Sequence, residues 1–279
     1  ELGFNQIIGV VNPKSSTNLI TETTLDLTGL KIKGIGAVEE VIAIIDSGKG
    51  NLLDGVTISG NANINLSSAK KLLTIDSPHL SFDAVALSEE TITPDDFLEI
   101  SNRIVVSEST MIMGNVKSIE DALTLGNLTN NLKGNVLLKN ETIPIVGEAS
   151  DLVNIVNSGI TVFDGINPTA IIQNPNLSVE EALVLGGAGL NLAGYVLAEG
   201  QFANIHQAVQ LLSYERLGLE NLKIEREEQL QSTTKANIFS LKQKGVLFEP
   251  SDSEKLFTID ETQVGPLEAL DLDAIGADL

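Results

Sequence analysis

Short apolar stripes at helical spacing alternate with short apolar strand-like runs along most of this chain. The clearest example opens with Ser178 and Glu181, whose spacing is that of a capping box, which satisfies free amide donors at a helix start. The apolar residues that follow lie on one helical face, and Gly186-Gly187 is expected to stop the helix. Residues 194–198 then read as a brief apolar strand. The stretch predicts a helix, a turn and a strand.

The same helix-then-strand pattern recurs from Ala37 onward. Expected helix starts lie near residues 37, 67, 93, 118, 148, 178, 204 and 232. A near-constant period of roughly 25–30 residues is typical of a solenoid. A second apolar pair in several repeats, as at 143–145 and 170–172, indicates two short strands and one helix per turn. The expected fold is therefore an α/β repeat solenoid, and the alternative is an ordinary α/β domain with irregular loops.

Two end segments depart from the repeat. Residues 1–36 are almost neutral and alternate in the manner of half-buried strands, with a turn at Asn12-Pro13. Residues 250–279 intersperse acidic side chains with Leu and Ile, which fits either a solvated tail or a segment that docks on a neighbour and orders there. The expected organisation is a β-rich N-terminal segment at 1–36, a repeat body at 37–249 and an acidic C-terminal segment at 250–279.

Composition narrows the function classes. A hydrophobic content of 42% with only 4% aromatics indicates a folded chain whose core is filled by small aliphatic side chains, which suits a narrow stack. The net charge of −21 has the wrong sign for a protein that follows nucleic-acid phosphates or docks on an anionic membrane. No segment has the length of a membrane span, so direct membrane insertion is not expected. With no cysteine, disulfides and thiolate chemistry are excluded.

Searches for catalytic motifs favour a protein that is not an enzyme. Gly48-Lys49-Gly50 has neither the glycine spacing nor the hydroxyl of a phosphate loop. Gly187-Ala188-Gly189 would need a glycine at the position of Leu192 to form a dinucleotide loop, and a helix stop explains it better. The only histidines, His79 and His206, exclude a multi-histidine metal site. No cofactor is expected, apart from the cation discussed next.

Three acids near the start of one helix are the candidate metal ligands. Asp95, Asp96 and Glu99 could hold a cation such as calcium between helix turns. Acids in a first helical turn are also expected because they complement the helix dipole, and that is the competing interpretation.

Residues 118–138 and 178–198, together with 160–164, resemble the degenerate repeats of large bacterial surface proteins. Those are adhesin, S-layer and haemolysin-type chains, whose units combine a short Ala/Leu helix with a strand. The resemblance covers residues 37–249 and implies an extracellular or cell-surface location. The Gly-Asp nonapeptide calcium repeats of that wider group are absent from this sequence, so calcium rolls are not implied.

The preferred function is a non-catalytic structural protein, a self-assembling subunit of an extracellular filament or surface layer with an adhesive role. The alternative is a ligand-binding solenoid that recognises a peptide or glycan along one face. A solenoid has two ends to cap or use, so a homo-oligomer or polymer joined through the chain ends is expected. A nearly uncharged strand could add to a sheet edge of the next molecule or cap its own stack. Its expected assembly residues are Phe4, Ile7, Ile8, Val10 and Val11.

Overall fold

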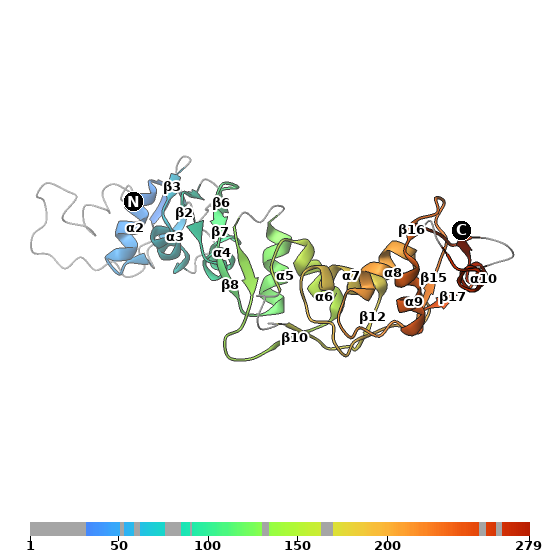
Figure 1. The fold of residues 1–279 in the computed structure, drawn as a ribbon. Coiled ribbons are helices and arrows are strands. Elements are labelled where there is room, and N and C mark those ends of the chain that lie inside the picture. The colour runs from blue at the N-terminus through green and yellow to red at the C-terminus, as the bar shows by residue number, and fades with distance from the viewer. Residues whose placement is uncertain are drawn as a thin grey trace, which may run out of the picture. The chain divides into compact units, whose positions relative to one another are not determined.

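The computed structural model describes residues 32–50, 53–58, 62–75, 85–89, 91–129, 134–162, 170–250, 255–260 and 264–279. These residues have a mixed α/β architecture, with nine helices and several small parallel sheets, none of them closed (Figure 1). They divide into two compact units. The first holds the described residues up to Gly114 and residues 134–135, and the second holds residues 115–129 and the described residues from Val136 onward.

Short strands and short helices alternate along both units. Up to residue 128 the elements are β1 (Ile32–Gly36), α2 (Val38–Asp46), β2 (Leu53–Ile58), β3 (Ala62–Ile64), α3 (Leu66–Leu73), β4 (Val85–Leu87), β5 (Thr91–Ile92), α4 (Pro94–Ile100), β6 (Val105–Val106), β7 (Met111–Ile112), β8 (Gly114–Val116) and α5 (Ile119–Leu128). After it come β9 (Val136–Leu138), β10 (Ile145–Gly147), α6 (Ala149–Asn157), β11 (Ala170–Ile172), β12 (Asn176–Leu177), α7 (Val179–Gly187), β13 (Val196–Leu197), β14 (Gln201–Ala203), α8 (Ile205–Leu212), β15 (Leu222–Ile224), β16 (Ser232–Thr233), α9 (Lys235–Gln243), β17 (Leu247–Phe248), β18 (Phe257–Ile259), α10 (Pro266–Ala274) and β19 (Ala277–Asp278).

A strand that precedes a helix commonly pairs in parallel with a strand that follows it. Strand β10 pairs with β11 across α6, with Ile145 opposite Ala170, and β12 pairs with β13 across α7, with Leu177 opposite Leu197. Parallel neighbours need such a crossover because a tight hairpin cannot reverse the chain twice. The sheets contain two or three strands each. Within the second unit, α5 to α9 lie in succession, each in contact with the next (Figure 1).

The helices share one burial pattern, counted from the first residue after each N-cap. From α2 to α9 the fourth and seventh positions are always buried, as Ala182 and Leu185 are in α7. The second position is exposed and the fifth is half-buried in each of these eight helices. A three-to-four-residue spacing of buried positions is the signature of a helix that packs one face on a core.

Helix starts follow the capping residues read from the sequence. The predicted starts coincide with the observed N-caps at Ala37, Thr93, Ser118, Glu148, Ser178 and Asn204. Ser178 Oγ accepts from the amide of Glu181, whose carboxylate accepts from the amide of Ser178 at 2.8 Å, so the predicted capping box is present.

Helix α7 does end at Gly187, but the prediction that Gly186-Gly187 stops it through a left-handed backbone was wrong. Both glycines lie inside α7, and the residue with a left-handed backbone is Gly189, at φ 90°. The small size of Gly186 is used for packing, as described below.

The N-terminal strand predicted to carry the assembly residues lies outside the described residues. None of the helices that the structure does describe combines the length and apolarity needed to cross a membrane.

Candidate functional site

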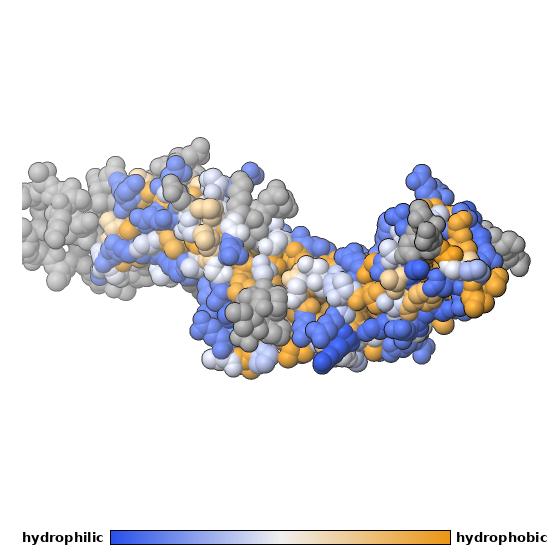
Figure 2. All heavy atoms as spheres, in the orientation of Figure 1, coloured by the Kyte–Doolittle hydropathy of each residue, from blue (hydrophilic) through white to orange (hydrophobic). Residues whose placement is uncertain are grey.

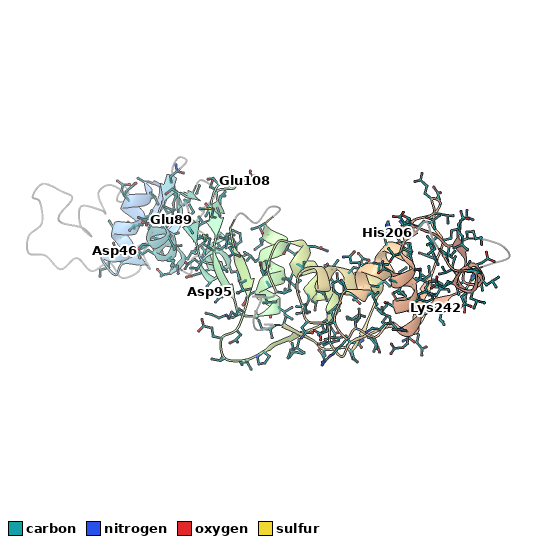
Figure 3. All side chains as sticks on the ribbon, in the orientation of Figure 1. Asp46, Glu89, Asp95, Glu108, His206 and Lys242 are labelled. Atoms are coloured by element: carbon teal, nitrogen blue, oxygen red, sulfur yellow. The ribbon has the colours of Figure 1, made fainter. Side chains whose placement is uncertain are left out.

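Neighbouring helices meet along lines that we call seams. In the seam between α3 and α4, Lys70 at the fifth position of α3 contacts Asp96 and Glu99, the third and sixth positions of α4, at 2.5 and 3.0 Å. On the other side of α3, Lys71 at the sixth position reaches back to Asp46 at the end of α2, 2.8 Å away (Figure 3). In α3 the fifth position therefore faces the following helix, and the sixth faces the preceding one.

The three acids predicted as metal ligands belong to this ionic seam. Asp95 is exposed at the second position of α4 (Figure 3). Asp96 and Glu99 contact the Lys70 ammonium. Burial raises the pKa of Asp96, but hydrogen bonds from Lys70 and the Thr93 hydroxyl lower it by more, leaving the pKa below its usual value. The same hydrogen bonds to Asp96 and Glu99 raise the pKa of Lys70. Within the described ranges, no group of three or more His, Asp or Glu side chains could hold a metal ion.

The seam between α5 and α6 contains an open groove of about 460 Å³. Its lining consists of the α5 residues Leu123, Gly126 and Asn127 and, on α6 and its C-cap, Asp151, Asn154, Ile155 and Ser158. We call it the α5–α6 groove. Gly126 sits at the eighth position of α5, where a Cβ would lie 2.8 Å from the Cβ of Ser158. The two backbones therefore approach closely there and leave the polar side chains above them open to solvent.

The seam between α7 and α8 has the same glycine but is filled. A Cβ on Gly186, the eighth position of α7, would lie 2.6 Å from the ring of Tyr214. The Tyr214 hydroxyl donates to the carbonyl of Leu183 at 3.2 Å and accepts from Gln210 Nε2 at 3.2 Å. Leu183 is itself half-buried in this seam and does not belong to the buried layer below it.

Helix α10 presents an apolar surface that the other helices lack. Leu270 occupies its fifth position and is 67% exposed, and Leu267 at the second position is 78% exposed. Leu279, next to β19, is 60% exposed. Figure 2 shows apolar residues at the surface around α10. We call Leu267, Leu270 and Leu279 the α10 face. Strand β19 lies beside it at the edge of the sheet β16-β18-β19.

The two histidines considered in the sequence analysis are His206 and His79. His206 is exposed at the second position of α8, and its Nε2 lies 3.2 Å from the carbonyl of Ser232 (Figure 3). His79 lies outside the described residues. Sequence reasoning missed both the α5–α6 groove and the α10 face. The signal for the groove is a glycine eight residues after one N-cap and a serine ten residues after the next.

Comparison of the chain with known protein families, curated proteins and solved structures gives no match.

Proposed function

We propose that this protein is a non-catalytic structural subunit that assembles end to end into an extracellular filament or surface layer. Its helix and strand units are proposed to form an α/β repeat solenoid, in which each unit covers the side of the one before it. The observation that carries the proposal is Leu270. The equivalent fifth position is half-buried in each of α2 to α9 and, as Lys70 in α3, contacts the following helix, but it is exposed in α10.

A second copy of the chain is the proposed occupant of the α10 face. Within each unit, successive helices from α2 to α4 and from α5 to α9 cover one another, and a second copy is proposed to cover α10 in their place. The proposed partner segment is residues 1–11 of the second copy, whose sequence is nearly uncharged and rich in Phe, Ile and Val. That segment would pair with β19, the edge strand of the described sheet, and cover the three leucines with Phe4, Ile7 and Ile8. Such a contact joins two different surfaces, so it propagates into a filament unless it closes a ring.

The assembly is tested by light scattering and negative-stain electron microscopy of the full chain over a range of concentrations. The intact chain is expected to form elongated assemblies. The double variant Leu267→Ser/Leu270→Ser and the deletion of residues 1–11 are expected to stay monomeric with the same urea midpoint.

A matched control is Ile143→Ser/Val146→Ser. It removes two exposed apolar side chains of similar size, 63% and 55% exposed, from another part of the second unit. This variant is expected to assemble like the intact chain. An intact chain that remains monomeric at high concentration would refute the proposal, as would α10 variants that assemble normally.

A second candidate function is ligand binding by the repeat body, and the α5–α6 groove is the observation that favours it. The two functions use different surfaces of the second unit.

A further inference from the structure

The α5–α6 groove is open because two small residues meet at one seam. The eighth helix position carries an aliphatic side chain in α2, α3, α6 and α8, namely Ile45, Leu73, Val156 and Leu212. It is glycine only in α5 and α7 among the described helices that reach this position and are followed by a seam. In the α7–α8 seam Tyr214, ten residues after the N-cap of α8, lies over the glycine. Ser158 occupies the same tenth position after the N-cap of α6.

Three polar side chains at this opening, Asn127, Asp151 and Asn154, have no hydrogen-bond or ion-pair partner among the described residues. Asn127 and Asn154 are exposed and Asp151 is half-buried. Ser158 Oγ donates to the carbonyl of Ile155 at 2.7 Å, which leaves its lone pairs free to accept. Leu123 supplies the apolar part of the lining, and Ile155 lies fully buried beneath it.

This set of groups matches the hydrogen-bonding pattern of hydroxyls. Two carboxamides supply both N–H donors and oxygen acceptors, while the carboxylate and the serine add acceptors. A sugar hydroxyl both donates and accepts, so it can use both kinds of group. An ammonium ion would use the acceptors only and leave the amide N–H groups facing a cation. A phosphate or carboxylate would meet the charge of Asp151, and none of the described residues that line the groove is basic.

We propose that the α5–α6 groove binds a neutral carbohydrate, with one or two sugar rings seated between Asn127 and the Asp151–Asn154 turn of α6. The volume of the groove falls within the range of small-molecule sites, about 300 to 1,000 Å³. The half-buried Leu123 side chain contacts the C–H groups of the sugar. This inference rests on the second candidate function, ligand binding, and is independent of end-to-end assembly.

The test is a titration of the isotope-labelled full chain with maltotriose, cellotriose, mannotriose and chitotriose, followed by NMR. At least one of these probes is expected to bind with a Kd of about 1 mM or tighter and to shift the amide resonances of Asn127, Asp151 and Asn154. Absence of binding by all four at about 10 mM would overturn the proposal.

The decisive variant is Ser158→Tyr, which copies the filled seam into the open one. Its hydroxyl is expected to reach the carbonyl of Leu123, as Tyr214 reaches that of Leu183, and binding should fall by about tenfold or more. Ser150→Tyr is the matched control, because it places the same side chain at an exposed position of the same helix. Asn154→Ala removes an exposed amide and provides the same readout if Ser158→Tyr does not fold. Unchanged binding in Asn154→Ala and in folded Ser158→Tyr would refute the site.

Two further arms identify the ligand class. Asp151→Asn keeps an acceptor and removes the charge, so sugar binding should change by only a few-fold. Ethylammonium is the probe for a cation, and it is expected to leave the groove resonances unshifted. If ethylammonium binds and the sugars do not, the carbohydrate assignment is wrong even though a binding site exists. Assembly is measured separately by light scattering, so its failure is not confused with either result.

Discussion

The α5–α6 and α7–α8 seams share the residues at two positions of their first helix and differ in the residue that faces them. Each has a leucine at the fifth position, Leu123 or Leu183, and a glycine at the eighth, Gly126 or Gly186. In one seam the facing residue is Ser158 and a groove remains; in the other it is Tyr214 and the space is filled. The side chain that faces this glycine therefore decides whether the seam is open or filled.

The shared core gives the largest expected effect. Leu125 and Leu185 occupy the seventh positions of α5 and α7, and both are fully buried. An aspartate at either position would bury an unpaired charge, so each substitution should lower the free energy of unfolding by about 4 kcal/mol or more. Urea denaturation followed by circular dichroism measures the loss.

Leu123→Asp and Leu183→Asp serve as the comparison for the substitutions at the seventh positions. They lie at the half-buried fifth positions of the same helices, where water can reach the new carboxylate. They are expected to lower the free energy of unfolding by about 1–2 kcal/mol. Equal losses at the fifth and seventh positions would show that the seams and the core do not form separate layers.

Removal of the aromatic ring should bring the filled seam closer to the open one. Tyr214→Ser leaves a gap above Gly186 and frees the Leu183 carbonyl, so the free energy of unfolding should fall by about 2 kcal/mol. Ser158→Ala in the open seam is the control and should change the free energy of unfolding by less than about 0.5 kcal/mol.

A double-mutant cycle tests whether the Tyr214 ring packs on Gly186. In the intact chain Gly186→Ala forces a Cβ against Tyr214 and should cost about 1–3 kcal/mol. In the Tyr214→Ser background the same alanine meets open space and should stabilise α7 by about 0.5–1 kcal/mol, because glycine is a poor helix former. Additive effects of the two substitutions would contradict the packing of the ring on this glycine.

The smallest expected effect concerns the α3–α4 seam, where the helices are joined by ion pairs. In the α5–α6 and α7–α8 seams the size of the facing side chain determines the contact. The pKa of Asp96 is lower in the folded chain than in the unfolded chain, so the unfolded state binds more protons over that window. The stabilisation from Asp96 is present above its unfolded pKa and is lost as the pH falls through its folded pKa. Asp96→Asn should therefore flatten the fall in stability below about pH 4, as followed by thermal melts. An unchanged pH profile would show that the Lys70 contact does not persist in solution.

The helix starts could be predicted because local chemistry determines them. Ser118, Thr93 and Asn204 accept hydrogen bonds from amides in the first turns of their helices, and such caps are visible in the sequence. Helix α10 was not assigned from the sequence. Its N-cap Gly265 has no side chain to accept a hydrogen bond, although the Glu268 carboxylate accepts from the Gly265 amide, and its apolar residues alternate with acids.

The groove could not be predicted because it depends on which residues face each other across two helices. Gly126 and Ser158 are far apart in the sequence, and neither is unusual alone. The pair can be recognised only when the helices are aligned on their N-caps and it is known that the fifth and eighth positions of α5 face α6. Asp96 and Glu99 show the same dependence, since their spacing suggested a cation site but Lys70, on another helix, decides their surroundings.

The parallel strand pairs have a consequence for how the chain folds. Every described pair joins strands with at most one helix between them in the sequence, as β10 and β11 are joined across α6. Closing each pair therefore requires only a short loop, with a modest loss of chain entropy. Chains dominated by such local contacts fold faster than those that must bring distant strands together. A nascent chain can form each pair soon after its second strand leaves the ribosome, which limits the time that its apolar strand edges are exposed to other chains.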